Sequence, residues 1–181
     1  MDSTVRRNLG LFFEDFTVGD IFRHPLGRTI LDADNTWFTL LTLNTNELHF
    51  NNEVAAASEH GRPIVNSGFT VALILGMSVS DISQNALANL GWNEIRLSAP
   101  VFVGDTLYAE SIVTAVRDSR SRPDAGILSC FTRGVNQDGV EVLSYRRSVL
   151  VLKRDAGQAH RRFPEPEVLI TTRVDLHQDS S

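Results

Sequence analysis

Asn44 and His49 are the residues of this sequence whose types and spacing could transfer protons. They lie five positions apart, directly after an apolar run. The unperturbed pKa of an imidazole is about 6.5, near neutrality, so the ring can accept and return a proton in one turnover. A histidine that follows a helix can also be purely structural, and this alternative stays open.

The elements that must position His49 are two helices on either side of it. Residues 32–43 are predicted to be helical because apolar side chains recur there at helical spacing, forming one apolar face. These side chains are Trp37, Phe38, Leu40 and Leu41. Asp32 or Asp34 can cap the start of this helix. Turn-forming residues 44–46 end it, and His49 begins a short helical stretch over residues 49–57.

The most apolar stretch predicts a third helix over residues 68–79, capped by Asn66 or Ser67. Its middle is apolar on every side, which is typical of a helix enclosed by protein. It is too short to cross a membrane. Gly76 is expected to permit a close backbone approach, because glycine inside a helix costs about 1 kcal/mol relative to alanine.

Extended segments dominate the rest of the chain. One imperfect strand over residues 21–30 precedes the helices, and four more follow the apolar helix. The four are residues 93–97, 106–116, 126–135 and 140–153. Asp138-Gly139 favours a hairpin, so three consecutive antiparallel strands are predicted. This order predicts an α+β fold, an antiparallel sheet wrapped around a long central helix.

The composition suits one globular domain, with 181 residues of which 42% are hydrophobic. We divide the chain into an N-terminal extension (1–10), a main domain (11–154) and a C-terminal tail (155–181). The net charge of -5 argues against nucleic-acid binding. No stretch approaches the apolar length of a membrane span or a signal peptide.

Cysteine and histidine usage bounds the chemistry further. Cys130 is the only cysteine, which excludes an intramolecular disulfide and fits a reducing cytoplasm. The histidines at positions 24, 60, 160 and 177 lack metal-ligand spacing with one another, so no metal site is predicted.

Four segments give the sequence a family resemblance. They are FEDFTVGD at residues 13–20, NTNELH at 44–49, GRPIVNSG at 61–68 and PVFVGDT at 100–106. In order and spacing they resemble the MaoC-like (R)-specific enoyl-CoA hydratases over residues 11–153. NLGW at 89–92, SRSRP at 119–123 and NQDG at 136–139 are most similar to the mesaconyl-CoA hydratase branch, also called β-methylmalyl-CoA dehydratase.

The resemblance implies a hot-dog fold that forms a homodimer or a higher homo-oligomer. It also implies an enzyme that acts on a CoA thioester without a metal or an organic cofactor. The implied activity is reversible hydration of a short, branched enoyl-CoA, with mesaconyl-CoA and β-methylmalyl-CoA as the best candidate pair. Two alternatives stay open, a hot-dog acyl-CoA thioesterase and a non-catalytic acyl-thioester binding protein.

The motif around His49 departs from the family form, in which an Asp stands at the position of Asn44 and a Pro at that of Glu47. An amide cannot act as a carboxylate base, although it can orient a water molecule. His49 is therefore expected to be the principal proton carrier, unless Glu47 replaces the missing carboxylate. The resemblance assigns the oxyanion donor to the backbone of Ser67, which could also be only a helix cap.

Substrate binding is assigned to the same helix start and to two arginines. Asn66 and Gly68 flank Ser67, and Arg120 and Arg122 are expected to contact the phosphates of CoA. Each arginine could instead be an ordinary exposed charge. A cationic side chain is also expected near the free carboxylate of a mesaconyl group, and the sequence does not locate it.

Overall fold

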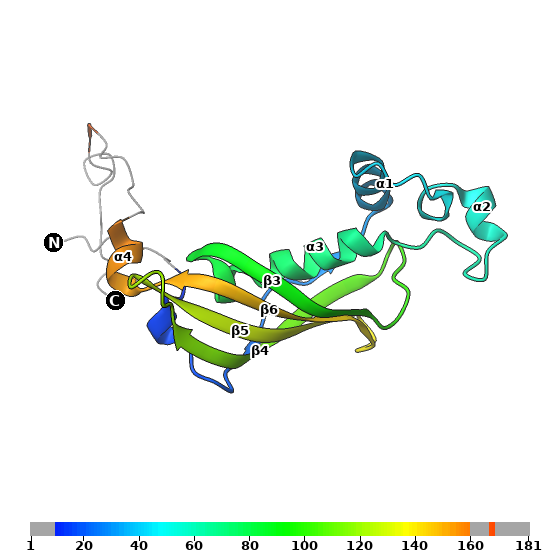
Figure 1. Ribbon diagram of the computed structural model, residues 1–181. Coiled ribbons are helices and arrows are strands. Elements are labelled where there is room, and N and C mark those ends of the chain that lie inside the picture. The colour runs from blue at the N-terminus through cyan, green and yellow to red at the C-terminus, as the bar shows by residue number, and fades with distance from the viewer. Residues whose placement is uncertain (1–9, 160–166, 169–181) are drawn as a thin grey trace, which may run out of the picture.

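A curved antiparallel sheet with one helix lying across it dominates the computed structural model, which describes residues 10–159 and 167–168 (Figure 1). The sheet has six strands in the order β1-β4-β5-β6-β3, and β2 pairs with β4 beside this path. The strands are β1 Ile21–Arg23, β2 Arg28–Thr29, β3 Ala86–Leu97, β4 Thr106–Asp118, β5 Ala125–Val135 and β6 Glu141–Leu152. The helix is α3 Ser67–Met77. This arrangement confirms the predicted α+β architecture.

The remaining helices lie mainly beyond the two ends of the sheet. They are η1 Phe13–Asp15, α1 Asp32–Leu41, η2 Glu47–His49, α2 Asn52–Ala56, η3 Val79–Ser83 and α4 Arg154–Ala159. α1 and α2 project past one end, whereas α4 lies at the opposite end (Figure 1). No helix in the described part of the chain is long and apolar enough to cross a membrane. Most of the predicted extension and tail, including His160 and His177, lies outside the described residues.

Strands β4, β5 and β6 form the consecutive antiparallel unit that the sequence predicts. Asn136 organises the β5–β6 turn, because its Oδ1 accepts hydrogen bonds from the N–H groups of Asp138 at 3.1 Å and Val140 at 2.9 Å. Gly139 completes this turn with φ +76°, a conformation that glycine adopts without strain.

Strand β3 is longer than predicted, since it begins at Ala86 rather than Asn93. Three register shifts against β6 interrupt its pairing, and they obscure the period-two pattern by which a strand is recognised. Within the described sheet β3 is an edge strand. It also exposes large apolar side chains, namely Leu87, Leu90, Trp92, Ile95 and Leu97.

Two apolar clusters fill the space between the helices and the sheet. One lies under α3 and includes Ile74, Leu107 and Tyr145, and the other lies under η3 and includes Ile82 and Leu128. Burial raises the pKa of the Tyr145 hydroxyl, so this residue stays neutral within the core. Phe12 and Phe16 of the N-terminal segment are also buried.

Helix α1 exposes most of its predicted apolar face and buries polar side chains instead. Its apolar side chains Trp37, Leu40 and Leu41 are 70%, 52% and 77% exposed, whereas Asn35 and Thr39 are buried. The predicted caps also differ, because Leu31 occupies the cap position before Asp32. The carboxylate of Asp34 accepts the Leu31 N–H at 2.9 Å from inside the first turn. Buried polar groups therefore attach α1 to the rest of the chain, together with the Phe38 ring, which packs edge to face against Phe69.

Helix α3 is covered on one side only, so its predicted complete enclosure is also wrong for the single chain. Thr70, Ile74 and Met77 are buried, whereas Ala72 and Gly76 are exposed. A Cβ at Gly76 would meet nothing within 4 Å, so none of the described segments makes the predicted close approach there. The open side of α3 is available to another molecule.

An ion-pair cluster on β4 predicts a defined acid sensitivity. A hydrogen bond from Arg133 at 2.7 Å, together with Arg23 at 3.3 Å, lowers the pKa of Glu110 below its ordinary 4.5. The folded chain therefore holds this proton less tightly than the unfolded chain, and stability is lost as pH falls through the lowered pKa. In urea titrations at neutral pH, Glu110→Gln should lower the free energy of unfolding by about 0.2–1 kcal/mol relative to wild type. On acidification, the free energy of unfolding of this variant should fall less than that of wild type.

The matched control is Glu53→Gln on α2, an exposed carboxylate without an ion pair among the described residues. It should reproduce the wild-type pH dependence. An unchanged acid response in Glu110→Gln would contradict the assignment.

Candidate active site

His49 ends the single turn η2 and is 8% exposed. Its Nδ1 lies 3.0 Å from the carbonyl oxygen of Ile64. A carbonyl oxygen only accepts, so Nδ1 carries the hydrogen and Nε2 of the neutral ring has a free lone pair. No group among the described residues is hydrogen-bonded to Nε2. His49 is therefore held in the tautomer that can accept a proton from water.

Asn44 lies in the turn between α1 and η2, where Leu43 has the left-handed φ of +56°. Its Oδ1 accepts the N–H of Asn46 at 2.9 Å, and Oδ1 of Asn46 accepts the N–H of Leu48 at 3.1 Å. No hydrogen bond joins the described side chains of Asn44 and His49. The acceptor of Asn44 serves the turn, so its NH2 group is what remains for a ligand or a water.

A buried polar network that the sequence analysis missed holds His49 against α3. Nδ2 of Asn35 donates to the carbonyl oxygens of His49 at 2.7 Å and Ile64 at 3.1 Å. Oδ1 of Asn35 accepts the N–H of Asn66 at 2.8 Å, and Nδ2 of Asn66 donates to Oγ1 of Thr39 at 3.1 Å. One amide thus joins three segments of the site. In the sequence, Asn35 and Thr39 lie four positions apart, a spacing that places them on the same face of α1.

The start of α3 is capped by Asn66, whose Oδ1 accepts the N–H of Gly68 at 2.9 Å. This bond occupies the Gly68 donor, whereas the N–H of Ser67 has no partner among the described residues. A Cβ at Gly68 would lie 3.3 Å from the Phe38 ring, so glycine here allows α1 to pack closely against α3. An unpaired N–H at a helix N-terminus is suited to stabilise an oxyanion.

A cavity of about 290 Å³ lies beside Ser67, close to the lower end of the range for small-molecule sites, about 300–1,000 Å³. Its walls come from the loop before α3, from α3 itself and from the β3–β4 connection. They include His60, Ile64, Ser67, Thr70, Pro100 and Val101. Ile64 links this cavity to His49, because its carbonyl accepts the imidazole hydrogen.

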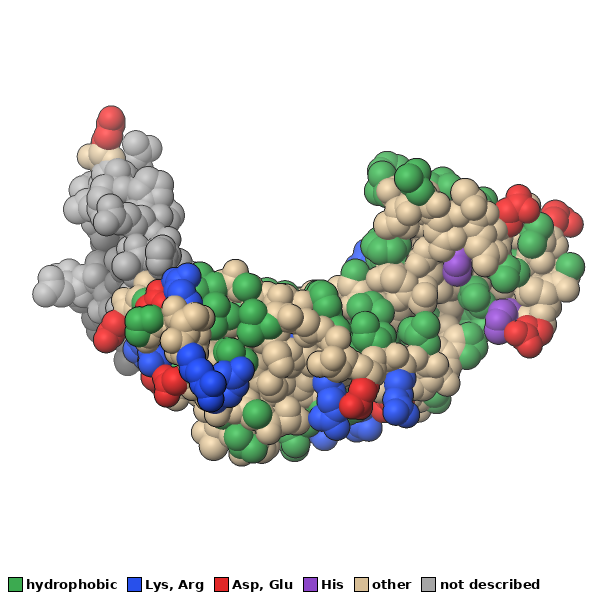
Figure 2. All heavy atoms as spheres, viewed as in Figure 1, with side chains coloured by type: hydrophobic (Ala, Val, Ile, Leu, Met, Phe, Trp, Pro, Cys, Tyr) green, Lys and Arg blue, Asp and Glu red, His purple; other side chains and the backbone are tan. Residues whose placement is uncertain are grey.

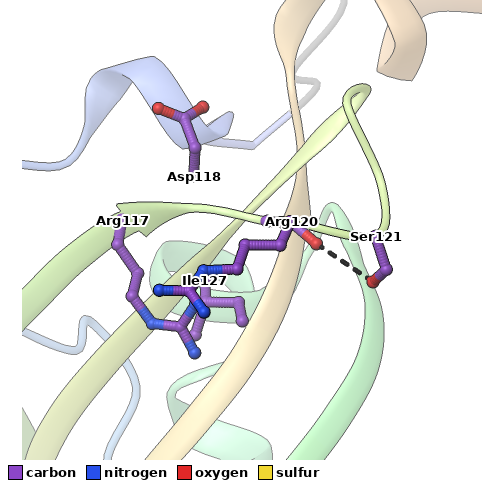
Figure 3. Close-up of a pocket in the computed structure, with 6 residues that line it drawn as sticks. Arg117, Asp118, Arg120, Ser121 and Ile127 are labelled. Carbon is purple, nitrogen blue, oxygen red and sulfur yellow. Dashed lines mark hydrogen bonds between the residues drawn. The ribbon is translucent and has the colours of Figure 1, made fainter.

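The structure does not bring Arg120 and Arg122 to His49. Both lie in the β4–β5 loop, at the end of the sheet opposite α1 (Figure 1). Arg122 forms hydrogen bonds of 2.9 and 2.7 Å with the carboxylate of Asp124. Arg120 and Arg117 line an open surface pocket of about 570 Å³, with Ile127 beside them (Figure 3).

Two acidic side chains near the site serve the local backbone and neighbouring side chains. Asp34 accepts a hydrogen bond from Arg28 at 2.7 Å, and this contact lowers its pKa. Glu47 is exposed and accepts a hydrogen bond from Asn51 at 3.2 Å. No group of three or more His, Cys, Asp or Glu residues within the described ranges could hold a metal ion.

Sequence comparison places this chain in a known family. A model of the mesaconyl-CoA hydratase family matches residues 1–162. The mesaconyl-CoA hydratase of Cereibacter sphaeroides is 39% identical over 151 residues, which are 83% of this chain and 44% of the relative. The β-methylmalyl-CoA dehydratase of Chloroflexus aurantiacus is 34% identical over 167 residues, 92% of this chain and 46% of the relative. This chain thus spans less than half the length of these relatives.

Solved structures give the same result for the fold. A MaoC domain dehydratase from Chloroflexus aurantiacus superposes with a TM-score of 0.79 at 34% identity, over 92% of this chain and 46% of that one. A MaoC-like dehydratase from Rhodospirillum rubrum gives 0.71 at 30% identity, over 80% and 99%. A double hot-dog protein of Mycobacterium tuberculosis gives 0.75 at 22% identity, over 82% and 46%, and supports the fold alone. The chain therefore belongs to the mesaconyl-CoA hydratase family of MaoC-like proteins and has the hot-dog fold.

Proposed function

We propose that this chain catalyses reversible hydration of a short, branched enoyl-CoA thioester, with mesaconyl-CoA and β-methylmalyl-CoA as the best candidate pair. The observation that carries the proposal is the fixed tautomer of His49, whose ring donates to the carbonyl of Ile64, a residue that lines the cavity at the start of α3. The names of the relatives supply the substrate class.

The proposed reaction adds water across the double bond with His49 as the proton carrier. Nε2 takes a proton from water while the water oxygen bonds to the β-carbon, and the NH2 group of Asn44 holds that oxygen in place. The thioester oxygen becomes negative as an enolate forms, and the free N–H of Ser67 donates to it. The imidazolium then returns the proton to the α-carbon, which restores His49.

The test is to mix the wild-type chain with mesaconyl-CoA and with crotonyl-CoA and follow loss of the enoyl-thioester absorbance. Hydration removes this absorbance without releasing thiol. Thiol release would instead indicate a thioesterase, and recovery of both esters unchanged would indicate a binding protein. Either result overturns the proposal.

A cytoplasmic location is part of the proposal, and the free, buried thiol of Cys130 supports it. A homodimer is also part of the proposal. The long edge strand β3 is a template for pairing with another chain. Apolar side chains on it are exposed, as is one side of α3. Figure 2 shows further apolar side chains on the projecting α1. A second copy would cover β3 and α3 together.

The dimer predicts that Leu90→Lys on β3 lowers the mass in solution from two chains to one, because a charge would have to be buried in the interface. Light scattering over a concentration series measures this mass. Leu26→Lys is the control, since Leu26 is 69% exposed in the β1–β2 turn. A monomeric wild type would contradict the proposed dimer.

A further inference from the structure

Arg147 is a buried cation that has no acidic partner among the described residues. It lies on β6, which pairs with β5 on one side and β3 on the other, and it is only 3% exposed. A guanidinium keeps its positive charge in proteins, so burial does not neutralise it. None of the ion pairs in the described part of the chain includes Arg147. A buried charge without a counter-charge is costly, so this guanidinium favours the binding of an anion.

Neutral hydroxyl groups satisfy only part of the Arg147 side chain. Its Nη2 lies 3.3 Å from Oγ of Ser78 and 3.5 Å from Oγ of Ser83. Both distances are longer than those of ordinary N–H···O hydrogen bonds, about 2.7–3.2 Å. Nε is buried and has no hydrogen-bond partner within the described ranges. A guanidinium has five N–H donors, so hydrogen-bonding capacity remains for another group.

A cavity of about 300 Å³ adjoins Arg147, at the opposite end of α3 from Ser67. This volume is at the lower end of the range for small-molecule sites, about 300–1,000 Å³. Its polar lining residues are Ser83, Asn89 and Arg147. The rest of the wall is apolar and consists of Leu75, Val79, Ala86, Leu87, Ala88 and Val149. The cavity shares no lining residue with the one beside Ser67, so the two are separate in the single chain.

The lining suits a ligand with one anionic end and a hydrocarbon body. The planar guanidinium matches the two oxygens of a carboxylate, and the apolar wall matches an alkyl chain. Phosphate or sulfate would place further charged oxygens against walls without donors, which is unfavourable. We propose that this cavity binds a small, free aliphatic carboxylate, with Arg147 as the residue that contacts the anion. The site is distinct from the proposed hydration site and does not depend on it.

The test compares butyrate with butyramide, a neutral ligand of nearly the same shape, by titration calorimetry at fixed ionic strength. Wild type should bind butyrate at least about 10-fold more tightly, as expected for a charge-assisted hydrogen bond. Arg147→Gln should weaken butyrate binding about 10- to 100-fold and change butyramide binding less than about threefold. Arg147→Lys should keep part of the preference, because it retains the charge without the planar fork. The wild-type comparison needs no variant, so it remains decisive if Arg147→Gln does not fold.

Arg146→Gln is the matched control, because it removes the neighbouring arginine, which is exposed and forms an ion pair with Glu94. It should bind butyrate as wild type does. Equal binding of butyrate and butyramide by wild type, or binding of neither, would overturn the inference. Sulfate that binds as tightly as butyrate would indicate a general anion site and would contradict the proposed carboxylate.

The cavity borders β3 and α3, so a carboxylate of a second copy is the rival occupant. In that case wild type would bind no butyrate, and Arg147→Gln would lower the mass in solution from two chains to one. Displacement of butyrate by butyryl-CoA would instead assign the cavity to the thioester site, and this result would also refute the inference. Butyrate binding that persists in saturating butyryl-CoA supports a separate site, whether or not the chain hydrates an enoyl-CoA.

Discussion

Replacement of His49 by alanine is expected to lower kcat for hydration of mesaconyl-CoA by about 10²–10⁴-fold, the usual contribution of a positioned acid–base group. The effect should be large because Asn44 at the usual Asp position cannot accept the proton in its place. Initial rates of absorbance loss at saturating substrate measure the change. KM should change little, because the missing imidazole acts mainly in the transition state.

His49→Gln separates the loss of chemistry from a loss of structure. A glutamine amide can donate to the carbonyl of Ile64 but cannot carry the proton. Both variants should therefore lose kcat, while His49→Gln should unfold at nearly the wild-type urea concentration. Wild-type turnover in either variant would show that another group is the base. Restoration of activity by Asn44→Asp in the His49→Ala background would place part of the proton transfer at position 44.

The fold was largely predictable because its signals are local. Asp138-Gly139 marked the β5–β6 hairpin, and the β-branched runs marked β4, β5 and β6. The extent of β3 was not predictable in the same way, because its bulges remove the alternation that identifies a strand. The apolar residues of α1 predicted one apolar face, but a helix pattern alone does not show whether such a face packs in an intramolecular core or lies on a surface open to another chain.

The site was predicted less completely, because its parts meet through long-range contacts. His49 and the cap Asn66 stand in motifs, but Asn35 contributes through carbonyl oxygens 14 and 29 residues away. The spacing of the apolar residues in α1 does not point to Asn35. Arg122 looked suitable for a phosphate, yet only the tertiary structure shows its pairing with Asp124 and its place at the far end of the sheet. The charge of a residue does not show which neighbour its side chain will pair with or at which end of the sheet it will lie.

Asn35→Ala is expected to lower the free energy of unfolding by about 2–4 kcal/mol, because it leaves several main-chain groups without their buried partner. Asn35 is 0% exposed and serves the carbonyls of His49 and Ile64 and the N–H of Asn66. Urea unfolding at neutral pH measures the loss. Turnover should also fall, since the same amide sets the position of His49 relative to the start of α3.

Thr36→Ala is the control in the same turn of α1, because Thr36 is only half-buried and forms no side-chain hydrogen bond within the described residues. It should change the unfolding free energy by less than about 0.5 kcal/mol. Asn35→Leu refills the volume without the hydrogen bonds, so it should remain nearly as unstable as Asn35→Ala if the bonds dominate. If leucine instead restored stability and turnover, packing would be what holds His49 against α3. Rescue of turnover without rescue of stability would contradict the shared role of this amide in folding and catalysis.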